Sequence, residues 1–144
     1  MDCDLATDLS CIDEFVDCFK VTNAIVIGDR THPKSKTKRV WLRSILTYLL
    51  GLVISNVLKT KVNDGQCGFK LFPLNKTVKT IFSNLKTRNY SFDLELLQKS
   101  LESGLLIQNK EVIWTEYRER GLGYILKIAF QLTQTMWKIK TSSL

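Results

Sequence analysis

Two aspartates separated by one residue stand at the start of the chain, in the sequence Asp2-Cys3-Asp4. On an extended or turning backbone, two carboxylates at this spacing can converge on one divalent cation, and their hard oxygen ligands suit Mg²⁺ or Mn²⁺. The same pair also suits a solvated acidic segment that favours the N-terminus of the helix after it. The spacing therefore predicts either a metal site with Asp2 and Asp4 as ligands or an acidic helix cap.

Three further groups of polar residues follow along the chain. Gly28-Asp29-Arg30 ends an apolar run with a fixed cation, Arg43 lies in a predicted helix, and the segment DGQCGFK at 64–70 packs an acid, two glycines and a lysine into a turn. Each group also has a purely structural interpretation: a turn at the end of a strand, an arginine whose aliphatic stem covers apolar surface, and a β-turn. Taken one at a time, these groups leave both alternatives open.

The elements that must position these side chains are predicted from hydrophobic periodicity. Apolar residues recur at helical spacing over 9–19, with Ser10 as the candidate N-cap, and a β-branched run at Asn23–Ile27 is typical of a buried strand. The strongly basic segment His32–Arg39 contains a proline and is predicted to be a surface loop. A helix follows at Val40–Leu58. Its apolar stretch is too short for a membrane span, so we expect a core or interfacial helix.

The second half of the chain continues the alternation of helix and strand. Helices are predicted at Thr77–Phe82 and Phe92–Leu101, a strand at Leu105–Trp114, and a basic amphipathic helix at Gly121–Lys140. This alternation predicts an α/β layered domain. Only about three strands are visible, which is few for a complete doubly wound sheet, so we expect further strands outside this sequence.

The charge and cysteine content narrow the classes of partner. The balance of 21 Lys and Arg against 14 Asp and Glu gives a net charge of +7, which favours nucleic acid, an acidic membrane surface or phosphate-bearing molecules. Nucleic acid is not expected, because aromatic residues are not interleaved with the basic run at 34–39. The four cysteines form no CxxC pair, which argues against a zinc site or a disulfide framework. Cys67 is expected to be a small packing residue.

Taken together and in this order, the polar groups resemble the family 2 glycosyltransferases that load sugars onto dolichyl phosphate, and among them those that transfer glucose. The resemblance extends from Met1 to about Glu116 and is carried by the strings MDCDLATDLS, IGDR, VWLRSIL, DGQCGFKLF, YSFDLELL and EVIWTE. It implies the C-terminal portion of a GT-A fold, with a mixed sheet flanked by helices. Residues 1–120 would form this part of the catalytic domain, and 121–144 a basic, membrane-interfacial helix.

The resemblance also implies roles for individual residues. Asp2 and Asp4 match the family's metal-binding motif, and Asp4 and Asp64 are the expected catalytic groups. The remaining positions surround the lipid acceptor: the phosphate-binding cations Arg30, Arg43, Arg118 and Arg120, the acceptor loop Gln66, Gly68, Phe69 and Lys70, and the supporting residues Asp93 and Glu95. The chain departs from the family at Tyr117–Gly123, where relatives carry a Gly-Ser-Lys-like turn.

The implied reaction is the transfer of glucose from UDP-glucose to dolichyl phosphate by a metal-dependent, inverting displacement on the cytosolic face of the endoplasmic reticulum membrane. The acceptor is a phosphate monoester that is already ionised near neutral pH, so positioning by arginine matters more than a general base. Because one displacement suffices, no covalent nucleophile is expected. In this family the donor nucleotide is bound by a segment before the metal motif, and we expect that half to lie outside this sequence.

Two alternatives remain at this point. The first is a mannosyl transferase or another polyprenyl-phosphate transferase, because the missing half reads most of the sugar. The second is a non-catalytic membrane-surface module that docks on anionic lipid through the basic loop Lys34–Arg39, the apolar helix Ile45–Leu58 and the C-terminal helix.

Overall fold

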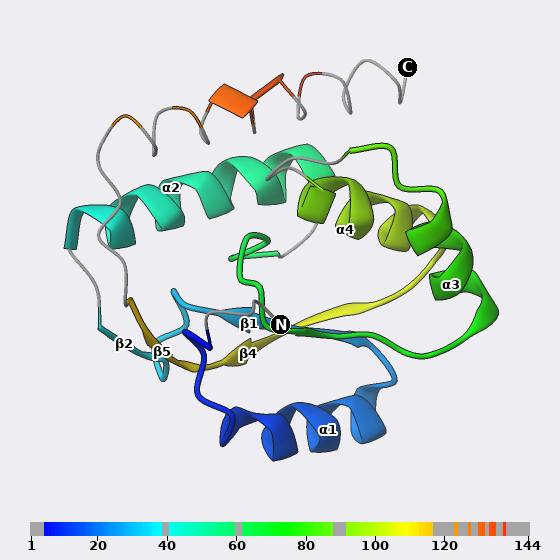
Figure 1. Ribbon diagram of the computed structural model, residues 1–144, viewed down its shortest axis with the longest axis horizontal. Coiled ribbons are helices and arrows are strands. Elements are labelled where there is room, and N and C mark those ends of the chain that lie inside the picture. Colours follow the sequence, from blue (N-terminus) through cyan, green and yellow to red (C-terminus); the bar gives the residue numbers. More distant parts are fainter. Residues whose placement is uncertain are drawn as a thin grey trace.

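A three-stranded mixed sheet forms the centre of the computed structural model (Figure 1). The middle strand β1 (Ile25–Asp29) pairs antiparallel with β3 (Lys70–Leu71) on one side and parallel with β4 (Ile107–Glu111) on the other. Helices cover both faces, which confirms the predicted α/β architecture with a mixed sheet flanked by helices. The structure describes residues 5–38, 41–59, 62–87 and 92–116, together with single positions between 123 and 137.

The helices are divided between the two faces of this sheet. In Figure 1, α1 (Cys11–Thr22) lies below the sheet, whereas α2 (Trp41–Leu58) and α4 (Phe92–Glu102) lie above it, and α3 (Lys76–Ser83) flanks α4. All five residues of β1 are buried because both faces of the strand are covered.

Alternate side chains of β1 enter two separate hydrophobic clusters. Ile25 and Ile27 pack with Ile54 of α2 and Leu97 of α4. Val26 points to the other face, into the cluster of Phe15 and Phe69. The Phe15 and Phe69 rings meet edge-on with centroids 4.7 Å apart. Successive side chains of a strand point to opposite faces, so one short apolar run joins both layers.

A second, two-stranded sheet extends the first at the end of β4. Strand β2 (Lys36–Lys38) pairs parallel with β5 (Ile113–Thr115). Thr7 forms an isolated antiparallel bridge with Trp114 of β5. The prediction of a loop over 32–39 is therefore wrong for 36–38. Thr37 is half-buried between two exposed lysines, and the strand is defined by backbone pairing that its polar composition does not reveal.

The long strand predicted at 105–114 is broken in two at Val112. The Val112 side chain is buried, its N–H donates to Ser35 Oγ at 3.0 Å, and its carbonyl accepts from Lys36 N at 3.0 Å. At Val112 the chain therefore stops pairing with the central sheet and starts pairing with the second one. The predicted strand thus becomes β4 and β5, and the junction lies against the loop that follows β1.

The four helices predicted between residues 9 and 101 are present, with shifted ends. Helix α1 begins after Ser10 and ends at Thr22, where Asn23 adopts a left-handed conformation and its N–H donates to Phe19 O. Ser10 occupies the N-cap position, but its side chain makes no capping bond; instead, Asp8 Oδ1 accepts from Ser10 N at 2.9 Å. In the part of the chain that is described, no helix has the length and apolar composition that crossing a bilayer requires. The predicted helix at 121–144 lies largely outside the described residues.

Candidate active site at the end of the central strand

Arg30 and Asp64 meet at the end of β1. Arg30 is the first residue after the strand, and Asp64 lies in the turn that follows α2. The Asp64 carboxylate accepts from Arg30 Nε at 2.6 Å and from Nη2 at 2.8 Å, and it also accepts from the Arg30 backbone N–H at 3.1 Å. The side chains are 15% and 1% exposed. A bidentate, largely desolvated pair of this kind holds the guanidinium plane in one orientation.

The Arg30 guanidinium also lies over the Trp114 ring, with its central carbon 5.3 Å from the ring centroid. Trp114 belongs to β5, and the segment Leu5–Asp8 runs alongside that strand: Thr115 N donates to Ala6 O at 2.8 Å and Asp8 N to Ile113 O at 2.9 Å. Residues 5–8, which follow Asp2 and Asp4 in the sequence, therefore lie beside β5, the strand that carries Trp114.

A second pair lies beside the first. Asp29 is fully buried, and its Oδ2 accepts from Asn63 Nδ2 at 2.8 Å. Its Oδ1 accepts from Thr31 N at 2.8 Å and from Thr31 Oγ1 at 2.6 Å. Neither Asp29 nor Asn63 was predicted as a site residue. The available signal was a carboxylate that ends a fully apolar strand, since a buried charge needs partners.

Lys70 and Asp93 form another buried ion pair on the acceptor-loop side. Lys70 Nζ lies 2.6 Å from Asp93 Oδ1 and 2.5 Å from Cys67 O, and the two side chains are 5% and 13% exposed. Lys70 thereby ties the turn at 64–67 to the first turn of α4. The structure brings together the predicted loop residue and the predicted supporting residue.

Glu95, the other predicted supporting residue, is engaged elsewhere. Its carboxylate accepts from the backbone N–H groups of Lys86 and Thr87 and pairs with Lys99 Nζ at 2.8 Å. Burial acts to raise the pKa of Glu95, but the hydrogen bonds from Lys99, Lys86 and Thr87 outweigh it and lower the pKa to about 2. Glu95 therefore anchors the segment between α3 and α4.

The remaining loop residues have distinct environments. Cys67 is buried in the α1-side cluster; burial, reinforced by the Asp64 charge, raises the pKa of its thiol to about 11. This confirms Cys67 as a packing residue. Cys67 packs directly against the backbone of Gly28, where an added Cβ would lie only 2.8 Å from Cys67 Sγ. Gln66 Nε2 is buried without a hydrogen-bond partner among the described residues.

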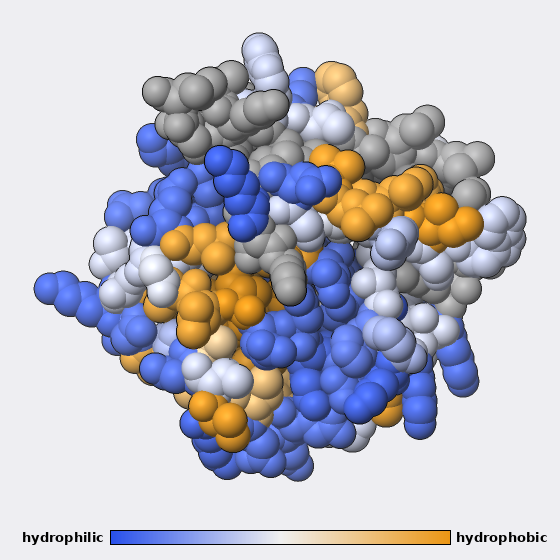
Figure 2. All heavy atoms as spheres, turned by 180° about the vertical axis from the view of Figure 1, so that it is seen from behind, coloured by the Kyte–Doolittle hydropathy of each residue, from blue (hydrophilic) through white to orange (hydrophobic). Residues whose placement is uncertain are grey.

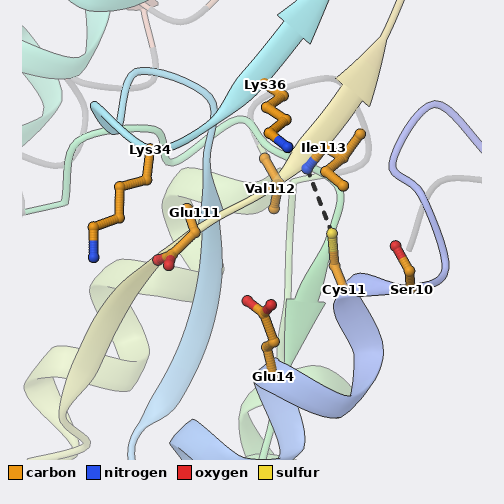
Figure 3. Close-up of a pocket in the computed structure, with 8 residues that line it drawn as sticks. All are labelled: Ser10, Cys11, Glu14, Lys34, Lys36, Glu111, Val112 and Ile113. Atoms are coloured by element: carbon orange, nitrogen blue, oxygen red, sulfur yellow. Dashed lines mark hydrogen bonds between the residues drawn. The ribbon is translucent and has the colours of Figure 1, made fainter.

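A hollow of about 230 Å³ opens between the start of α1 and the junction of β4 with β5 (Figure 3). No predicted site residue lines it. Its charged residues are Glu14, Glu111, Lys34 and Lys36, and Lys110 pairs with both carboxylates, at 3.6 Å and 3.3 Å. Cys11 Sγ accepts from Ile113 N at 3.4 Å and closes one wall. The mixture of charges selects neither an anion nor a cation.

Several predicted site residues lie outside what the structure describes. These are Asp2, Asp4, Arg118 and Arg120, together with the side chain of Arg43, whose backbone belongs to α2. Among the described residues, no group of three or more His, Cys, Asp or Glu side chains is placed to hold a metal ion. The predicted metal ligands are thus not tested, although two carboxylates remain a donor set that suits Mg²⁺ or Mn²⁺.

Comparison with known proteins gives a consistent set of relatives. The chain is 32% identical over 130 residues to "Dolichyl-phosphate beta-glucosyltransferase" of Dictyostelium discoideum, covering 81% of this chain and 39% of the relative. It is 34% identical over 95 residues to the Homo sapiens protein of the same name, covering 65% and 29%. It is 31% identical over 96 residues to the Saccharomyces cerevisiae one, covering 65% and 28%. These matches confirm the resemblance found in the sequence.

The chain spans less than two fifths of the length of the curated relatives it matches, between 28% and 39% for these three. No family model matches the chain. No solved structure matches it either.

Proposed function

The chain is related in sequence to dolichyl-phosphate beta-glucosyltransferases over about a third of their length, and on this premise we propose that it serves the transfer of glucose from UDP-glucose to dolichyl phosphate. The observation that supports the proposal best is the bidentate contact of Arg30 with Asp64 inside the segment that carries the resemblance. The three relatives described above are named for the transfer of glucose, which favours a glucosyl donor over the alternative of a mannosyl donor.

The proposed reaction is a single displacement. An oxygen of the acceptor phosphate attacks the anomeric carbon of the donor, a new carbon–oxygen bond forms, and the bond from that carbon to the diphosphate breaks. The electron pair leaves with UDP. The acceptor oxygen is already ionised near neutral pH, so no proton has to be removed.

Arg30 supplies fixed positive charge for the acceptor phosphate in this proposal. Asp64 holds the guanidinium from one edge and the Trp114 ring supports its face, so the cation is oriented before the lipid arrives. Preorganised groups of this kind stabilise charge in the transition state without reorganising during the reaction. Since both Asp64 oxygens accept from Arg30, we assign Asp64 a positioning role rather than that of a base.

Asp2 and Asp4 are the proposed ligands of the divalent cation. When bound, such a cation stabilises the negative charge that develops on the departing diphosphate. The segment that follows these residues lies along β5, next to the strand residue that supports Arg30. This arrangement favours one site that serves both the donor and the acceptor phosphates.

We further propose that α2 rests on the cytosolic surface of the endoplasmic reticulum membrane. Its apolar side chains remain exposed on the face away from the core: Trp41, Ile45, Tyr48, Leu49 and Leu52. Figure 2 shows one group of apolar atoms in the upper right of the face seen from behind, at the height of α2 in Figure 1, and a second group nearer the middle. A lipid acceptor would then reach Arg30 from the membrane.

A transfer assay tests the proposal. The chain, joined to the donor-binding half that this family carries before its metal motif, is incubated with radiolabelled UDP-glucose, Mg²⁺ and dolichyl phosphate in phosphatidylserine-containing vesicles, and label in the lipid extract is counted. We expect labelled lipid from the wild type and none from Asp4→Ala or without Mg²⁺. Vesicle binding without labelled product would instead support the non-catalytic membrane module.

A further inference from the structure

Two neighbouring residues at the end of β1 contact two neighbouring residues of the turn after α2. Arg30 donates to Asp64, and one residue earlier on each segment the polarity reverses, since Asp29 accepts from Asn63 at 2.8 Å. We infer that Asp29 and Asn63 are positioning residues that hold Arg30 and Asp64 in register. Their part in catalysis rests on the proposed function, whereas their effect on Arg30 does not.

The Asp29 carboxylate organises its own side of the contact. Its Oδ1 is occupied by the N–H and the hydroxyl of Thr31, so the backbone turns sharply around Arg30. The Asp29 carbonyl also accepts from Ser35 Oγ at 2.5 Å, and Ser35 Oγ accepts from Val112 N at 3.0 Å. The loop from β1 to β2 is therefore pinned at both ends, with Arg30 inside it.

Asn63 is held from the other side by α2. A Cβ at Gly51 would lie 1.9 Å from Asn63 O, so the helix and this backbone are in direct contact. One residue earlier, Val62 is fully buried and its carbonyl accepts from Ser55 Oγ at 2.6 Å. The backbone of Asn63 is thus fixed against α2, and its side chain reaches across to Asp29.

The side-chain contacts Arg30–Asp64 and Asp29–Asn63 differ in how strictly they fix the spacing of the two segments. The long Arg30 side chain can follow small shifts of the backbone, whereas the Arg30 backbone N–H reaches Asp64, and the short side chains of Asp29 and Asn63 meet, only when the two segments keep one spacing. A displacement of about 1 Å at a reacting group can cost about a hundredfold in rate. Loss of the Asp29 contact should therefore loosen Arg30 without removing any group from the proposed site.

The two oxygens of Asp29 allow a polarity-swap test. Oδ1 serves Thr31 and Oδ2 serves Asn63, so in Asp29→Asn the amide oxygen can keep Thr31 while the amide nitrogen takes the place of Oδ2. Asn63→Asp alone puts two carboxylates face to face. The double variant Asp29→Asn with Asn63→Asp restores one donor and one acceptor. Asn84→Asp, an exposed position at the end of α3, is the matched control for the same chemical change.

The readout is the exchange of the Arg30 Nε–H proton with water, followed by nitrogen-15 NMR. We expect exchange about tenfold faster in Asn63→Asp, a smaller increase in Asn63→Ala, and recovery in the double variant, with the control unchanged. Unchanged exchange in both single variants would overturn the inference. Asn63→Ala keeps the test decisive should Asn63→Asp not fold.

Transfer activity separates this inference from the proposed function. We expect the turnover number to follow the same order as the exchange rates, with the Michaelis constant for UDP-glucose little changed. If the exchange rates follow the expected order but the wild type transfers no glucose, the positioning pair stands and the transferase proposal falls.

Discussion

The ammonium group of Lys70 lies 2.6 Å from Asp93 Oδ1 and joins β3 to the first turn of α4. It also donates to the carbonyl of Cys67, so the same cation closes the turn that carries Asp64. Both charged groups are largely removed from water. Removing one of them would take the ion-pair partner away from the other buried charge.

Replacing the cation tests this contact. In Lys70→Met the Asp93 charge loses its ion pair with the Lys70 ammonium group, and we expect the free energy of unfolding to fall by about 3 kcal/mol. The double variant Lys70→Met with Asp93→Leu should recover part of that loss, since an apolar pair leaves no buried charge. Urea denaturation measures both. Equal losses in the single and double variants would contradict a stabilising role for the pairing.

The orientation of Arg30 should matter more than its charge. Arg30→Lys keeps one positive charge but loses the planar fork that contacts both Asp64 oxygens, so we expect a fall in turnover of about a hundredfold. Lys99→Arg, which changes a cation beside Glu95, is the control and should leave turnover unchanged. Steady-state kinetics over a range of dolichyl phosphate concentrations make the comparison. Near-normal turnover in Arg30→Lys would show that a point charge suffices.

Gly51→Ala distinguishes helix propensity from packing. Alanine in a helix interior is normally more stable than glycine by about 1 kcal/mol. Here the added methyl group would lie 1.9 Å from Asn63 O, so we expect the protein to lose about 1 to 3 kcal/mol instead. Thermal and urea unfolding give the sign. A stabilised variant would mean that α2 does not press on the turn before Asp64.

The stability of the chain should depend on Glu95 at acid pH. The folded pKa of Glu95, about 2, lies below the ordinary value of 4.5 because the hydrogen bonds outweigh burial, so its contribution is fully present above pH 4.5. The contribution is lost as the pH falls from 4.5 towards 2, because the carboxylate takes up a proton earlier in the unfolded chain. We expect Glu95→Gln to reduce this acid sensitivity. Identical pH profiles for wild type and variant would remove Glu95 as its cause.

The spacing of apolar residues along the chain predicts a helix or strand well where those same residues are the ones that become buried. The apolar run of β1 and the helical spacing in α1, α2 and α4 were readable because burial on a face follows directly from periodicity. Strand β2 was missed for the opposite reason. Its lysines and threonine show no apolar pattern, and only pairing with β5, far along the chain, makes it a strand.

The sequence by itself determined which residue types were available for phosphate and metal chemistry, and its motifs were specific enough to identify the relatives. Only the tertiary structure decided which of them meet. Arg30 and Asp64 are 34 residues apart, as are Asp29 and Asn63, and Lys70 and Asp93 are 23 apart. No local periodicity encodes such contacts. They follow from how α2 and α4 pack across the sheet and from the need of each buried charge for a partner.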